Sequence, residues 1–216
     1  MNSNRLTKSI FLWSKNIAKN NWVHLSEQMF RDLSIEDVAC RPAVSVRSVM
    51  QAVDEAAFLA DYTMWHHNLW DDKNNPNGNK LRTYRCYKVN LEVEKYLLLN
   101  LHRLQRRTLA MLRIGVLPLE IETGRYAKPK TPLSERLCGL CNIDTIEDER
   151  HFLLHCPLYD DQRDALFRCA INVNRHFVSL SNEGKFVFLM TEPRIQSYLA
   201  KSVNLMYNRR NIFRRK

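Results

Sequence analysis

The chain has 216 residues, 45% of them hydrophobic, and carries 33 Lys and Arg against 23 Asp and Glu, a net charge of +10. This composition excludes a disordered chain and allows one sizeable core or two small ones. No apolar run approaches the roughly 18 residues of a membrane span, and the N-terminus shows no secretory signal. Six cysteines without such a signal favour a reducing intracellular compartment, the nucleus or the cytoplasm, and no membrane partner.

Apolar residues recur at helical spacing through most of the chain, and only five glycines are available for turns. The sequence therefore predicts a mainly α fold, a helical bundle. In the N-terminal helical region, 1–70, apolar stripes predict helices over 6–17, 22–33 and 46–64, and we expect these stripes to face a core. The polar stretch 71–79, D-D-K-N-N-P-N-G-N, is the predicted linker.

The remaining residues, 80–216, are predicted to form a basic helical domain. Helices are expected at 97–111, 158–170, 186–190 and 193–206. Between the first two of these helices, residues 119–123 alternate between apolar and polar side chains. They allow at most one short strand in an otherwise helical fold.

The segment 138–156 has the pattern of a metal site. It reads C-G-L-C, then nine residues, then H-F-L-L-H-C. Two sulfurs of a Cys-x-x-Cys turn reach one ion without strain, and a His and a Cys further along close a tetrahedron. The spacing predicts a zinc-knuckle-like insert with one structural Zn²⁺, held by Cys138, Cys141, His151 and a fourth residue. A redox-active cysteine pair beside core histidines is the alternative interpretation.

Two residues compete for the fourth position, His155 and Cys156. On an α-helix His151 and His155 lie on one face at i and i+4, whereas Cys156 lies about 140° further round from His151. Pro157, however, ends the helix at Cys156 and frees the thiol to turn toward the metal. The His-x4-Cys ending is also that of zinc knuckles, so we expect Cys156 as the ligand and His155 as the alternate.

Several motifs of this domain together resemble one family. They are K-L-R-T-Y-R-C-Y-K, R-I-G-V-L-P-L-E-I-E-T-G-R-Y, E-R-L-C-G-L-C and E-D-E-R-H-F-L-L-H-C-P-L-Y. From about residue 80 to the C-terminus the chain resembles the zinc-binding C-terminal region of LINE-type (non-LTR) retrotransposon reverse-transcriptase polyproteins, as a short orphan copy. The family's Cys-Cys-His-Cys motif falls on Cys138, Cys141, His151 and Cys156. The resemblance implies a non-catalytic, zinc-dependent nucleic-acid-binding module.

Basic residues cluster in two parts of the domain, 80–113 and the last residues of the chain, whereas 144–164 is acidic. The first cluster is interleaved with tyrosines; cations suit phosphates, and aromatic rings suit unpaired bases. A solvated helix face with core tyrosines is the alternative interpretation. The residues expected to bind RNA or DNA are Lys80, Arg82, Arg85, Lys88, Arg103, Arg106, Arg107, Arg113, Arg209, Arg210, Arg214 and Arg215.

No catalytic motif is found in the sequence. The chain lacks a Gly-rich phosphate loop, a G-x-S-x-G elbow, an H-E-x-x-H pair and the paired acidic motif of a polymerase palm. Asp160, Asp161 and Asp164 are expected along one helix as a solvated face, not as a magnesium site. We therefore expect no enzyme. The alternative function is a helical protein-interaction or structural domain with a protein partner, from a domesticated or decaying element copy.

Overall fold

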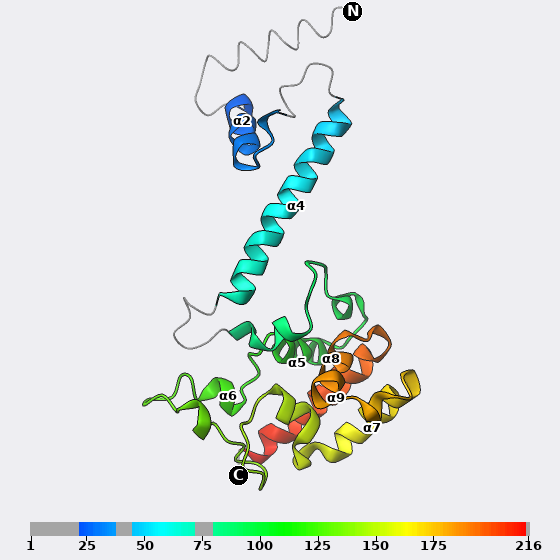
Figure 1. The fold of residues 1–216 in the computed structure, drawn as a ribbon. Coiled ribbons are helices and arrows are strands. Elements are labelled where there is room, and N and C mark those ends of the chain that lie inside the picture. Colours follow the sequence, from blue (N-terminus) through cyan, green and yellow to red (C-terminus); the bar gives the residue numbers. More distant parts are fainter. Residues whose placement is uncertain (1–21, 38–44, 72–79, 215–216) are drawn as a thin grey trace, which may run out of the picture. The chain divides into compact units, whose positions relative to one another are not determined.

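The structure is a computed structural model that describes residues 22–37, 45–71 and 80–214. The chain divides into two compact units, Met1–Asn68 and Leu69–Lys216. Within the described residues the fold consists of helices, with no sheet and one isolated β-bridge (Figure 1). The predicted mainly α class is therefore confirmed. The predicted helix over 6–17 and all but the first residue of the predicted linker lie outside the described residues.

The first unit contains α2 (Trp22–Asp32) and most of α4 (Val46–Trp70). The helical prediction for 46–64 is confirmed, but the expectation that this stripe faces a core is not. Val46 is 77% exposed and Met64 is 60% exposed. Helical spacing produces an apolar face, yet burial needs a partner of comparable length, and in the described part of this unit α2 has only 11 residues.

None of the helices in the described residues combines the length and the apolar character needed to cross a bilayer.

The second unit is built around its last helix. It contains α5 (Arg103–Arg113), α7 (Asp160–Val173), α8 (Asn182–Thr191) and α9 (Gln196–Phe213), and α9 packs against the other three (Figure 1). The predicted stripe of the last helix is fully buried in this core: Leu199, Val203 and Met206. Apolar side chains at i, i+4 and i+7 therefore hold α9 in the centre of the unit.

The helix predicted over 97–111 begins later than its period indicates. Lys95–Leu98 forms a single 3-10 turn, and α5 starts at Arg103, where the His102 side chain accepts the N–H of Leu104. The shift changes the buried face. Leu104 is 51% exposed, and the fully buried leucines of α5 are further along, Leu109 and Leu112.

Residues 119–123 do not form the short strand that their alternation allows. They form a single helical turn, α6 (Glu120–Thr123). The Glu147 carboxylate accepts the N–H of Glu120 at 2.8 Å, which satisfies a donor at the start of this turn. The capping group comes from a distant part of the chain, so a local pattern could not reveal it.

Candidate metal centre

The cysteine pair lies in a short hairpin, 136–147. The N–H of Glu147 donates to the Arg136 carbonyl and the N–H of Cys138 donates to the Thr145 carbonyl, both at 2.9 Å. These bonds flank the isolated antiparallel bridge between Leu137 and Ile146. Cys138 therefore ends the first side of the hairpin, and the Cys-x-x-Cys sequence forms the start of its turn.

The histidine and the third cysteine come from a π-turn, His151–His155. The N–H of Cys156 donates to the His151 carbonyl at 2.8 Å, an i→i+5 bond in place of the α-helical i→i+4 bond. Cys156 itself is extended, with φ −65° and ψ 118°, as the following Pro157 requires. A π-turn is wider than an α-turn, so His151 and Cys156, five residues apart, lie toward one side. The offset of about 140° expected for an α-helix therefore does not apply here.

The structure brings together the four residues of the expected ligand set. The ligand atoms of Cys138, Cys141, His151 and Cys156 all lie within 4.8 Å of one another, and Cys141 Sγ is 3.4 Å from His151 Nε2. The three cysteines are free thiols. This group could hold one metal ion. The alternate ligand, His155, is exposed and is not part of the group.

Of the three thiols in the cluster, Cys138 has the strongest thiolate character. A hydrogen bond with Cys156 lowers the pKa of the Cys138 thiol to about 3, and the same contact raises the pKa of Cys156. Burial raises the pKa of the Cys141 thiol. His151 is buried, and its Nδ1 makes no hydrogen bond within the described part of the chain. A bound cation would neutralise the Cys138 thiolate and would replace the protons of the other two thiols.

A buried ion pair fastens the hairpin to α9. Arg210 donates from Nε to Glu147 Oε1 at 2.9 Å and from Nη2 to Oε2 at 2.6 Å, and neither side chain is more than 2% exposed. Burial raises the pKa of the Glu147 carboxyl, while the Arg210 guanidinium opposes that shift. Because its carboxylate also caps α6, Glu147 joins three elements: the hairpin, α9 and α6.

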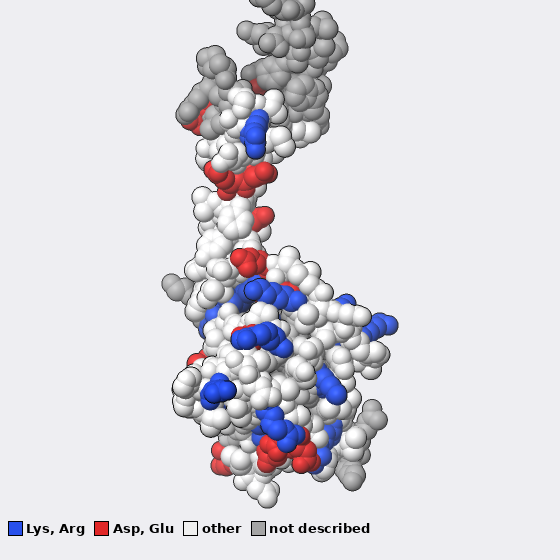
Figure 2. Space-filling model, turned by 90° about the vertical axis from the view of Figure 1, so that its right-hand side faces the viewer, with Lys and Arg blue, Asp and Glu red and all other residues white. Residues whose placement is uncertain are grey.

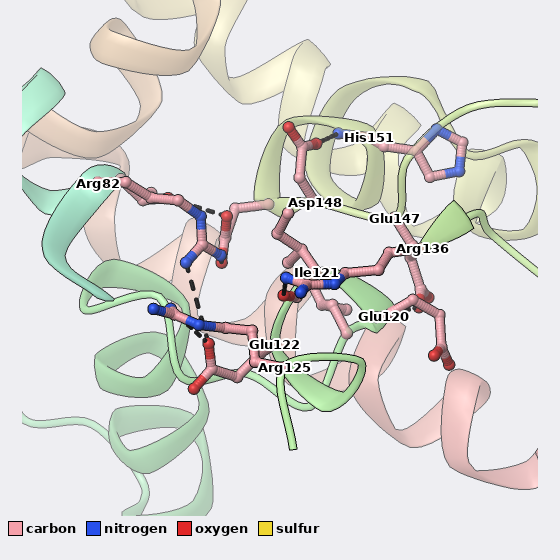
Figure 3. A network of polar contacts seen from close by, with 12 residues as sticks. Arg82, Glu120, Ile121, Glu122, Arg125, Arg136, Glu147, Asp148 and His151 are labelled. Atoms are coloured by element: carbon pink, nitrogen blue, oxygen red, sulfur yellow. Dashed lines mark hydrogen bonds and ion pairs between the residues drawn. The ribbon is translucent and has the colours of Figure 1, made fainter. Parts of the chain in front are cut away.

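A second buried carboxylate lies beside the π-turn. Glu149 is 1% exposed and accepts hydrogen bonds from Arg82 Nη2 at 2.8 Å and from Thr83 Oγ1 at 2.9 Å. Figure 3 shows Arg82 also facing Glu122, which Arg125 contacts from the other side. In the sequence, Glu147 and Glu149 stand out only as part of the acidic stretch 144–164, and nothing there indicates that they tie the hairpin and the π-turn to the rest of the unit.

The prediction of the nucleic-acid surface is wrong for two residues, Arg113 and Arg210, because both are buried. Arg210 is 1% exposed and is paired as described above, and Arg113 is 4% exposed. The Arg113 guanidinium bonds to Glu94 and lies against the rings of Tyr87 and Tyr96, at 4.6 and 5.1 Å from their centroids. Both tyrosines are themselves buried, so the core interpretation holds for them.

Other members of that predicted surface each contact a carboxylate, a backbone carbonyl or an aromatic ring of the protein. They are Arg82, Arg85, Lys88, Arg106, Arg209 and Arg214. Arg103 and Arg107 on α5 are exposed. The side chain of Lys80 and all of Arg215 lie outside the described residues. Within the described part of 80–113, the exposed cations are therefore Arg103 and Arg107 on α5 and Lys95 in the 3-10 turn before it.

The three aspartates considered for magnesium lie along the first turns of α7, as expected. Asp160, Asp161 and Asp164 are exposed. Asp160 pairs with Arg163 on the same helix, and Asp161 lies 3.6 Å from Arg209. Among the described residues they form no metal-ligand group, whereas the cysteine cluster does.

Fold and site together define a helical protein with a Cys3His cluster that could hold one metal ion. Comparisons with protein-family models, with curated proteins and with solved structures found no match to this chain.

Proposed function

We propose that Cys138, Cys141, His151 and Cys156 bind one structural Zn²⁺. Bonds of about 2.0–2.3 Å place neighbouring ligand atoms of a tetrahedral zinc about 3.5–3.8 Å apart. The observed separations, at most 4.8 Å, reach that range with small side-chain movements. Four protein ligands leave no open position for water, so this ion stabilises the fold and has no catalytic role. The close approach of these four ligand atoms is the observation that carries the proposal.

The helical domain that this ion stabilises is a non-catalytic module that binds RNA or DNA, like the LINE-type region it resembles in sequence. Its exposed basic residues support this function, because phosphates need cations in contact with solvent. Figure 2 shows lysine and arginine side chains in separate groups over one face of the molecule. The exposed basic residues that support it lie on α5 and on the loop after α6: Arg103, Arg107, Lys128 and Lys130.

Metal content and salt dependence test the two parts of this proposal. The purified chain is expected to carry about one zinc per molecule, measured by elemental analysis. Fluorescence anisotropy with a single-stranded RNA and a DNA of the same sequence should show affinity that falls linearly on a log-log plot as salt rises, with a slope of about −0.7 per phosphate contact. A protein without zinc contradicts the first part. Failure to bind either strand at low salt contradicts the second.

A protein partner is the second candidate function, and exposed apolar side chains favour it. Val89, Val93 and Leu98 are 72%, 69% and 78% exposed in the segment before α5. Apolar groups gathered on a surface are typical of interaction sites. Replacing all three by Ser should abolish binding to such a partner, while leaving nucleic-acid affinity unchanged.

A further inference from the structure

A closed basic loop follows α6. The N–H of Thr131 donates to the Gly124 carbonyl at 3.0 Å, which closes the sequence R-Y-A-K-P-K between them. In Figure 1 this loop points away from the other helices of its unit. None of the predicted functional residues lies in this loop, which falls between the basic cluster 80–113 and the metal motif.

Arg136 anchors the base of this loop. Its Nε donates to the Thr131 carbonyl and its Nη1 donates to the Ile121 carbonyl, both at 3.0 Å (Figure 3). The side chain passes directly against Gly124. A Cβ at Gly124 would lie 2.8 Å from Arg136 Cγ and 2.9 Å from Cδ, so only glycine admits the arginine without displacement. The two ends of the loop are thus held together by one side chain.

The loop presents an aromatic ring and two cations to solvent. Tyr126 is 58% exposed, and Lys128 and Lys130 are exposed on either side of Pro129. A proline between the lysines restricts the backbone there, which lowers the entropy lost when a ligand orders the loop. Exposed aromatic rings stack on unpaired bases, and lysines beside them bind the adjacent phosphates.

The base of the loop is also electropositive. Burial, and then the neighbouring guanidiniums of Arg125 and Arg82, lower the pKa of Arg136, and Glu122 opposes this shift. Glu122 is shared by Arg82 at 3.9 Å and Arg125 at 3.2 Å. Arg82 also pairs with the buried Glu149, so three guanidiniums lie beside two carboxylates, Glu122 and Glu149, at the base of the loop.

We propose that the loop 124–131 is a contact site for single-stranded nucleic acid, in which a base stacks on Tyr126 and adjacent phosphates bind Lys128 and Lys130. This inference rests on the proposed nucleic-acid function and names the element that carries it. It assigns the recognition of unpaired bases to a part of the chain outside both basic clusters of the sequence.

A charge-matched pair of variants tests the loop. The loop variant is Tyr126→Ala/Lys128→Gln/Lys130→Gln, and the control is Tyr198→Ala/Arg168→Gln/Arg175→Gln, which removes an exposed tyrosine and two exposed cations elsewhere. The probes are fluorescent oligouridylate, oligothymidylate and a DNA duplex, used with the full zinc-loaded chain. Loss of the stack and of two phosphate contacts should weaken single-strand binding by at least about tenfold and reduce the salt slope by about 1.4. The control should weaken binding less than about threefold.

Tyr126→Phe and Tyr126→Ala separate stacking from charge. The phenylalanine variant should keep single-strand affinity and the alanine variant should lose it, while neither changes duplex binding, because paired bases are not free to stack. A preference for oligouridylate or for oligothymidylate identifies RNA or DNA as the ligand. A loop variant that binds single strands as the wild type does overturns the inference and leaves the proposed function standing. A wild-type chain that binds no strand overturns both.

Discussion

The metal-site segment 136–156, which consists of the hairpin 136–147 and the π-turn, belongs to the same unit as the helical core around α9, but the two are held together differently. The core buries side chains such as Leu199 and Val203 completely, and its stability grows with the apolar area removed from water. The hairpin has a single isolated bridge and depends on a ligand cluster and on buried carboxylates paired with arginine. Each substitution in the core removes only part of the stability that apolar burial provides. A ligand cluster, in contrast, is lost when one of its members is removed.

Removing the metal should have the largest effect, and it should affect the hairpin but not the helical core. Cys156→Ser should lower zinc occupancy and expose the amides of 136–147 to hydrogen exchange, because structural zinc supplies folding free energy directly. A core change, Leu199→Ala, should cost about 2–5 kcal/mol in free energy of unfolding and leave zinc content unchanged. Equal protection of the hairpin amides in the two variants would contradict a hairpin that depends on its metal.

Breaking the Glu147–Arg210 pair should have the next largest effect. Arg210→Met leaves a carboxylate buried without its cation, and the free energy of unfolding should fall by about 3–5 kcal/mol near neutral pH in chemical denaturation. Burial raises the pKa of Glu147 above its unfolded value, so the native state binds the proton more tightly and stability falls as pH rises through that raised pKa. The loss of unfolding free energy caused by Arg210→Met should therefore be smallest near pH 4.

The double variant Glu147→Leu/Arg210→Met is the control for that experiment. It removes both charges, so it should recover part of the stability that Arg210→Met loses. A double variant less stable than the single one would show that the carboxylate matters mainly as the cap of α6.

His155→Ala should have the smallest effect. The side chain is exposed and lies outside the ligand group, so the free energy of unfolding should change by less than about 0.5 kcal/mol. Zinc content should stay near that of the wild type. A loss of zinc larger than that of Cys156→Ser would restore the helical-face argument and make His155 the ligand.

The helices that pack the core were predictable because their periods are long and regular. The stripe of α9 continues from Leu199 through Val203 and Met206 to Arg210, all on one face. An arginine in phase with a core stripe is the signal that Arg210 is buried, whereas the charge of the terminal cluster alone does not distinguish it from its exposed neighbours. Arg113 lies four residues after the buried Leu109, so it too is in phase with the buried face of its helix.

The ligand set of the candidate site was predictable from spacing and residue type, but its supporting contacts were not. Cys138 and Cys141 belong to one turn, which spacing alone defines. The pairing of Glu147 with Arg210 joins residues 63 apart, and no local pattern connects them. The same holds for 119–123, where a distant carboxylate decides between a strand and a helical turn.

The π-turn at 151–155 also determines how this segment tolerates changes in length. Its i→i+5 bond accommodates one residue more than an α-turn does. Shortening the stretch between His151 and Cys156 by one residue permits an ordinary α-helical turn, with the two ligands at i and i+4 on one face. We therefore expect that this segment can bring the same two ligands together with a gap one residue shorter, in which an α-turn replaces the π-turn.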